Sequence, residues 1–90
     1  MKNKIKLKML TEKQMKTFQL IVSLRNQRKY PSLEKLGIMF GISRHSVNDR
    51  VNALVEKEYI IKDEHGACIP TINGIEQYMQ DVMSGRFKRK

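Results

Sequence analysis

The spacing of apolar residues over residues 31–61 predicts two short helices joined by a tight turn and followed by a strand. Gly41 stands at the turn, where a left-handed residue usually ends a helix and glycine adopts that conformation without a Cβ clash. Ile42 is expected to fill the angle between the helices, and Ser43 to cap the second one. The residues at helical spacing are Leu33, Leu36 and Met39 or Phe40 in the first helix, and Val47, Val51, Leu54 and Val55 in the second.

The second of these helices, about 43–58, has a polar face opposite its apolar one. Its polar side chains are His45, Asp49 and Asn52 opposite the apolar stripe, with Arg44, Ser46 and Asn48 beside it. A helix that buries one face and presents short hydrogen-bonding side chains from its first turns is suited to the DNA major groove. The pattern therefore predicts a helix that reads DNA.

Several of these polar residues have two possible roles. Arg44 can pair with a guanine or hold a phosphate, and Asn48 or Asn52 can pair with an adenine. Asp49 can accept from cytosine, but it can equally form an ion pair with Arg50 or an i,i+4 pair with His45. The sequence leaves both readings open.

The rest of the chain predicts a helix on each side of this unit and a β-hairpin. Thr11 and Gln14 form a capping box for a first helix over about 11–28, and basic residues in its last turn suit the helix dipole. Residues 59–62 and 67–71 read as hairpin strands around a polar turn at 63–66. Residues 1–9 alternate lysines with apolar residues, which suggests a short edge strand.

The fourth predicted helix is capped by Thr71 or Asn73 and ends at Gly85. It has apolar residues at three- and four-residue steps, and we consider two roles for them: packing against the first helix, or forming the seam of a homodimer. The candidate seam residues are Ile75, Met79, Val82 and Met83.

Length and charge narrow the possible functions. Ninety residues make one domain, and 18 basic against 9 acidic residues give a net charge of +9, with the excess at the two ends of the chain. Cys68 is the lone cysteine and is expected to be a half-buried apolar residue, which fits a reducing cytoplasm. No membrane span and no signal peptide is evident in the sequence. Metal-ligand spacing, a phosphate-binding loop and a nucleophile with a base are not evident either, so we expect no enzyme activity and no cofactor.

A resemblance to known families agrees with this interpretation. Gly41, Ile42, Ser43 and Arg44, with the surrounding run from Pro31 to Ile60, resemble the core of GntR-type bacterial regulators, and the helix around Phe18 is similar to the first helix of the SOS repressor (LexA) DNA-binding domain. The resemblance implies a winged helix-turn-helix in which Gly66, with His65 beside it, reaches the minor groove. It also implies DNA contacts at the matching positions Ser43, Arg44, His45, Ser46 and Asn48. Asn48 stands where these families often have arginine, and Asp49 adds a negative charge, so base preference does not transfer.

The sequence thus predicts a mainly α fold with a small β-hairpin: a winged helix-turn-helix with a three-helix core, a β-wing and an extra C-terminal helix. Its domains would be a basic arm at 1–9, a DNA-binding domain at 10–85 and a basic tail at 86–90. The expected DNA contacts are Ser43, Arg44, His45, Ser46, Asn48, Asp49 and Asn52 in the recognition helix, Lys62, His65 and Gly66 in the wing, and Tyr30, Ser32 and Lys35 at phosphates.

The predicted function is sequence-specific binding of double-stranded DNA by a small cytoplasmic transcriptional regulator. We expect a homodimer on a palindromic or repeated site, without membrane contact or a small-molecule effector. Two alternatives stay open. One is binding to an origin or partition site within a plasmid or phage replication initiator, and the other is a winged-helix module for protein–protein contact.

Overall fold

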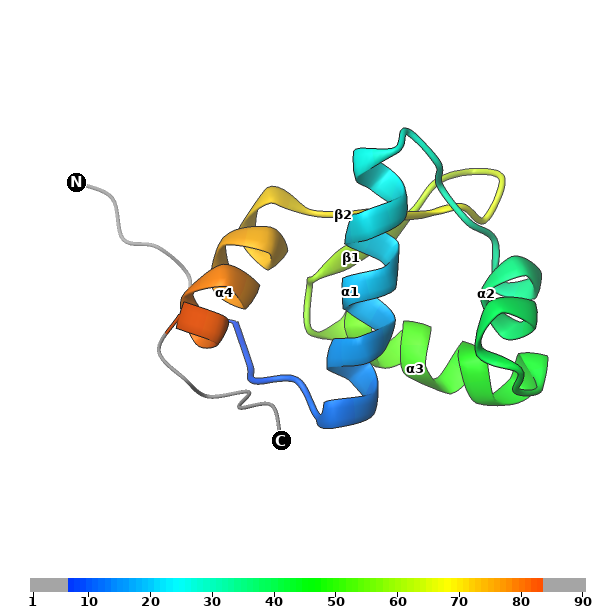
Figure 1. Cartoon of the computed structure of the whole chain (residues 1–90), viewed down its shortest axis with the longest axis horizontal. Helices are drawn as coiled ribbons and strands as arrows, with labels where there is room; N and C mark the ends of the chain where they lie inside the picture. Colours follow the sequence, from blue (N-terminus) through cyan, green and yellow to red (C-terminus); the bar gives the residue numbers. More distant parts are fainter. Residues whose placement is uncertain (1–6, 84–90) are drawn as a thin grey trace.

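The computed structural model describes residues 7–83, and over this range the chain is mainly helical with one two-stranded antiparallel hairpin (Figure 1). The prediction of a mainly α chain with a small hairpin is confirmed. No helix among these residues has both the length and the apolar character needed to cross a membrane. The elements in chain order are α1 (Glu12–Asn26), α2 (Leu33–Phe40), α3 (Arg44–Glu56), β1 (Ile60–Lys62), β2 (Cys68–Pro70) and α4 (Ile72–Met83).

Each of the four described helices begins at a side-chain oxygen that caps it. Thr11 Oγ1 accepts from the amide of Gln14 at 3.2 Å, and Gln14 Oε1 accepts from the amide of Thr11 at 3.1 Å, so the capping box is formed. Ser32 and Ser43 cap α2 and α3. Thr71 rather than Asn73 provides the oxygen at α4, where Thr71 Oγ1 accepts from the amide of Gly74 at 2.9 Å.

The helix ends follow the prediction only where a glycine marks them. Gly41 ends α2 with φ 69°, as expected. However, α1 and α3 end two residues earlier than predicted, because Arg28 (φ 64°) and Glu58 (φ 67°) take the left-handed conformation without being glycine. The amide of the residue after Glu58, Tyr59, donates to the carbonyl of Leu54 at 2.9 Å, which closes the end of α3.

The hydrophobic core lies between α1, α2, α3 and the hairpin. Its centre is aromatic: the ring of Phe18 meets Tyr59 edge-on at 5.3 Å and Tyr78 at 5.6 Å between centroids. The fully buried aliphatic residues around it include Ile21, Leu36, Val47, Val51, Leu54 and Ile60.

Two residues assigned to the inward stripes point outward instead. Val55 is exposed, which corrects the prediction, because Leu54 occupies the inward position and the next residue is rotated by about 100° around the helix. On α2 the alternatives resolve in favour of Phe40, which packs against the core, whereas Met39 is exposed.

Residues 7–10 run as an irregular segment, so the strand predicted for residues 1–9 does not form at residues 7–9. Polar side chains fix its backbone instead. The Tyr59 hydroxyl donates to the Lys8 carbonyl at 2.7 Å, Lys57 Nζ donates to the Met9 carbonyl at 2.9 Å, and Leu7 is buried. The last residues of the expected basic arm are therefore packed against the domain. Residues 1–6, Gly85 and the tail at 86–90 lie outside the described residues.

The hairpin pairs Ile60 with Pro70 and Lys62 with Cys68. Pro70 closes β2, where a missing amide donor is tolerated, as predicted. Cys68 is fully buried rather than half-buried, and this burial raises the pKa of its thiol. The amide of Cys68 also donates to the carbonyl of Pro31 at 2.9 Å, which ties the hairpin to the connection between α1 and α2.

Helix α4 packs with a small and polar face toward the domain. Gly74, Gln77 and Asp81 are buried, and Gln77 Nε2 donates to Asp81 Oδ1 at 3.1 Å. The apolar stripe is turned toward solvent, apart from the partly buried Ile75. The alternative that this stripe packs back on the first helix is therefore wrong. Its place is taken by Tyr78, whose hydroxyl accepts from Gln19 Nε2 at 2.6 Å.

Substitution of Gly74 tests how α4 is attached. A Cβ there would lie 2.6 Å from the carbonyl oxygen and 2.7 Å from the Cα of Tyr59, and neither backbone atom can move without disturbing the core. Gly74→Ala is expected to lower the free energy of unfolding by ~1–3 kcal/mol, the usual cost of overpacking. Urea unfolding followed by circular dichroism measures the change. Gln80→Ala on the exposed side of α4 is the control and should stay within ~0.5 kcal/mol of wild type. Equal effects would mean that α4 is not held at Gly74.

Candidate nucleic-acid interface

The candidate site begins at the close contact between α2 and α3. Gly37 is buried on α2, and a Cβ there would lie 3.2 Å from the Ile42 carbonyl oxygen and 3.5 Å from Val47 Cγ2. The amide of Ile42 donates to the Gly37 carbonyl at 3.1 Å, which fixes the turn after Gly41. The two helices can approach this closely because Gly37 has no side chain, and helical periodicity alone did not single out this glycine.

Helix α3 presents the predicted polar face. Val47, Val51 and Leu54 are fully buried, and the polar residues lie on the other sides of the helix. The exposed ones are Ser43, Arg44, His45, Ser46, Asp49 and Asn52, and Asn48 is half-buried. Ser43 Oγ accepts from the amide of Ser46 and donates to its hydroxyl, both at 3.1 Å, so these two serines act first as a cap.

The charged residues of α3 divide between surface and packing roles. His45 Nε2 lies 3.8 Å from Asp49 Oδ2, and both side chains are well exposed. This is the i,i+4 alternative considered for Asp49. Arg50 instead lies over the ring of Phe40, with its guanidinium carbon 5.4 Å from the centroid, and so helps to hold α3 against α2.

The turn of the hairpin is organised by the carboxylate of Asp63. Its Oδ1 accepts from the amide of His65 at 2.8 Å and from the amide of Ala67 at 2.9 Å. These backbone donors, that of Ala67 first, hold the pKa of Asp63 below its usual value. Gly66 has φ 81°, which glycine adopts without strain. The side chain of His65 is exposed, and its Nε2 lies 3.6 Å from Glu64 Oε2. The expected contact residues Lys62, His65 and Gly66 thus lie in or beside an ordered turn.

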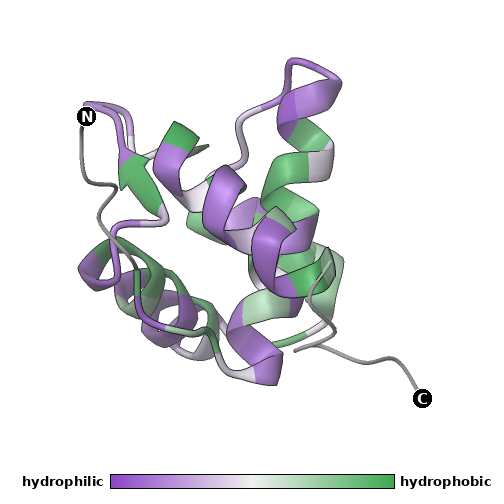
Figure 2. Ribbon diagram, turned by 90° about the vertical axis from the view of Figure 1, so that its left-hand side faces the viewer, coloured by the Kyte–Doolittle hydropathy of each residue, from purple (hydrophilic) through white to green (hydrophobic). Residues whose placement is uncertain are grey.

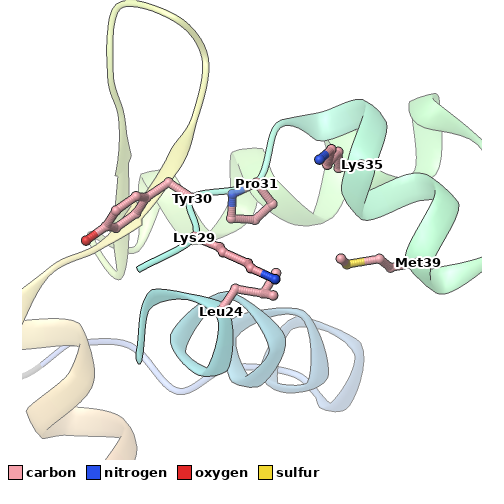
Figure 3. A pocket seen from close by; sticks show the side chains of 6 residues that line it. All are labelled: Leu24, Lys29, Tyr30, Pro31, Lys35 and Met39. Carbon is pink, nitrogen blue, oxygen red and sulfur yellow. The ribbon is translucent and has the colours of Figure 1, made fainter. Parts of the chain in front are cut away.

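A hollow of about 400 Å³ opens between the end of α1, the connection after it and α2 (Figure 3). Two of the three predicted phosphate-contact residues, Tyr30 and Lys35, line it, and Ser32 caps α2 nearby. Lys29 also lines the hollow, although its place after the first predicted helix suggested only a favourable interaction with the helix dipole. The apolar lining is Leu24, Pro31 and Met39.

These parts share one end of the molecule. Figure 1 shows the hairpin turn, α2 and the start of α3 at the end opposite to α4. The elements that carry these candidate contact residues therefore lie toward one end of the molecule, and α4 with the candidate seam lies at the other. Within residues 7–83 no cluster of histidine, cysteine and carboxylate side chains is arranged to hold a metal ion.

No model of a protein family and no curated protein matches this chain.

The carboxylate of Asp63 is expected to make the stability of the hairpin turn depend on pH. A carboxyl whose pKa is lowered in the folded state contributes stability above its unfolded pKa, near 3.8, and loses that contribution as pH falls through the folded pKa. Asp63→Ala is expected to lower Tm at neutral pH, and the deficit relative to wild type should shrink in acid. Asp63→Asn keeps the acceptor oxygen without titrating, and is the control. A deficit for Asp63→Ala that is the same at both pH values would contradict this role for the carboxylate.

Proposed function

We propose that this chain is a winged helix-turn-helix domain that binds double-stranded DNA sequence-specifically, as a small cytoplasmic transcriptional regulator. In this proposal α3 enters the major groove, and the β1–β2 hairpin is the wing that contacts the adjacent backbone or minor groove. Lys29, Tyr30 and Lys35 around the hollow contact phosphates on the flank of the same groove.

The observation that carries the proposal is the two-sided character of α3. One face is fixed in the core by Val47, Val51 and Leu54, and the opposite face exposes hydrogen-bonding side chains from its first turn onward. A rigidly mounted helix with an unobstructed polar N-terminal half is what reading base edges requires. An amphipathic helix with no binding role would do as well with long solvated lysines and glutamates. Lysine and glutamate are absent from the first two turns of α3. The polar residues of these turns are Arg44, His45, Ser46, Asn48, Asp49 and Arg50, and Asn52 follows in the third turn.

Arg44 and Asn52 are the strongest candidates for reading bases. Arg44 begins α3 and is exposed, so its guanidinium is placed to pair with guanine O6 and N7. Asn52 is exposed two turns later and matches the donor and acceptor of adenine. Arg50 is given a structural role, because it lies over Phe40.

The charge of the chain supports a polyanionic partner. The net charge of +9 gives long-range attraction to phosphates, and three lysines lie at the hollow and the hairpin: Lys29, Lys35 and Lys62. Asp49 is unfavourable beside phosphates, and its Oδ2 lies 3.8 Å from His45 Nε2 on the same exposed face.

Selection of bound sequences from random duplexes is the direct test. A recovered motif would support sequence-specific binding, and two inverted half-sites would also give the symmetry of the complex. Binding of all duplexes alike, with a steep salt dependence, would leave a non-specific DNA-binding protein. Absence of binding to any duplex at low salt would overturn the proposal in favour of a protein–protein module.

Two substitutions of Arg44 separate base reading from phosphate contact. Arg44→Ala is expected to weaken specific binding by ~1–3 kcal/mol and to relax preference at one base position. Arg44→Lys keeps the positive charge but cannot form the bidentate hydrogen bonds of a guanidinium. It should therefore relax the same base preference while largely keeping affinity for random DNA. Fluorescence anisotropy with specific and random duplexes measures both. If Arg44→Lys behaves as wild type on both, Arg44 is a phosphate contact.

Lys62 tests whether the hairpin touches the backbone. Lys62→Gln is expected to reduce affinity for all duplexes and to lower the slope of log K against log salt by ~0.9, the value for one phosphate contact. Lys16→Gln is the control, because Lys16 pairs with Glu12 on α1 at 3.7 Å and is not part of the candidate interface. An unchanged slope for Lys62→Gln would remove this lysine from the interface.

A further inference from the structure

The solvent side of α4 is more apolar than the side that packs on the domain. Ile72, Met79, Val82 and Met83 are exposed by 72%, 54%, 43% and 82%, while Gly74, Gln77 and Asp81 are buried. Figure 2 views the molecule from the side of α4 and shows apolar and polar segments along this helix. A helix in a small domain ordinarily buries its apolar stripe, and an apolar face left in solvent marks a contact surface.

The spacing of the stripe fits another helix. Ile72, Ile75, Met79 and Val82 follow each other by three, four and three residues, which is the alternation of the two core positions in a coiled-coil heptad. A stripe with this alternation lies straight along a helix and receives the side chains of a facing helix between its own. The exposed apolar residues of α2 are Ile38 and Met39, which are adjacent and form no such repeat.

We propose that this face of α4 pairs with the same face of a second copy of the chain. The apolar faces of α1, α2 and α3 are occupied by the core, so within residues 7–83 the heptad stripe available to a partner helix is that of α4 itself. The stripe contains no charged residue, so two copies can face each other across it without opposing like charges. Such a contact is self-complementary and closes as a twofold dimer.

The charges on α4 also permit a second copy at this place. The helix contains Glu76 and Asp81 and no lysine or arginine, and Asp81 is buried on the side that packs on the domain. Two copies that pair through the apolar stripe therefore oppose no basic side chains of α4.

The position of α4 sets the shape of the dimer. The molecule is 39 Å long, and α4 lies at one end of it, with the start of α3 at the other (Figure 1). Pairing through α4 puts the two α3 helices at the far ends of an elongated dimer, further apart than the ~34–36 Å of one DNA turn. Half-sites on DNA lie one helical turn or a multiple of it apart. If the chain binds DNA as proposed, the half-site centres should therefore lie about two turns, or roughly 21 base pairs, apart.

Cysteine cross-linking tests the pairing without DNA, so its outcome is independent of the proposed function. Met79→Cys lies in the stripe and should form a disulfide-linked dimer under mild oxidation. Gln80→Cys is exposed on the polar side of the same helix and should not. The native Cys68 is buried, so wild type provides the background. Absence of a dimer from Met79→Cys, or equal yields from both variants, would overturn the proposal.

A charge in the seam gives a second readout. Met79→Glu opposes two like charges across the twofold axis and is expected to raise the dimer dissociation constant by about a hundredfold. Gln80→Glu adds the same charge outside the seam and should leave it nearly unchanged. Sedimentation measures assembly, and circular dichroism confirms that both variants fold. Equal loss from both variants would overturn the seam, and selected DNA sites with half-sites one turn apart would overturn the end-to-end arrangement.

Discussion

Tyr59 joins four parts of the fold, and most of the structure depends on its contacts. Its ring meets Phe18 of α1 edge-on, and its hydroxyl holds the Lys8 carbonyl of the N-terminal segment. Its own carbonyl accepts from the amide of Thr71 at 2.8 Å. Its backbone packs so closely against Gly74 of α4 that a Cβ on residue 74 would clash with it. Burial, together with the charge of Asp81, raises the pKa of Tyr59 to about 12, so the hydroxyl remains a donor at any ordinary pH.

The contact between α2 and α3 has a different consequence, because it fixes the helix that we propose to read DNA. Gly37 lets the helices approach, Ile42 fills the angle between them, and Arg50 over Phe40 holds their outer edges together. A side chain on a helix mounted in this way loses little further backbone freedom when it binds, so more of its interaction energy remains as affinity. The hairpin is mounted on the same unit through the bond from Cys68 to the Pro31 carbonyl.

The two ends of the molecule differ in chemistry. One end carries the basic and hydrogen-bonding residues of α3, the hairpin and the hollow, and the other carries α4, which has acidic and apolar residues but no basic ones. Separating a hydrogen-bonding surface from an apolar one lets each face a different partner, because polar side chains can pair with base edges and phosphates while apolar burial favours contact with another protein surface. We propose that these partners are duplex DNA and a second copy of the chain.

The sequence by itself determined the features that depend on a few neighbouring residues. The caps at Thr11, Ser32 and Ser43, the glycine end of α2 and the inward stripe of α3 follow from local hydrogen bonding and from helix periodicity. The polar face of α3 follows from the same periodicity, and its exposure was predicted correctly.

Only the tertiary structure decided which of two possible faces a helix buries. Helix α4 has an apolar stripe that predicts burial, yet it packs through Gly74, Gln77 and Asp81, because Tyr59 leaves room only for a glycine and the backbone of residue 7 needs the acceptor that Gln77 provides at 3.3 Å. The ends of α1 and α3 could likewise not be predicted from the sequence, because the left-handed residues after them, Arg28 and Glu58, are not glycines. Such outcomes depend on partners distant along the chain, and periodicity carries no information about them.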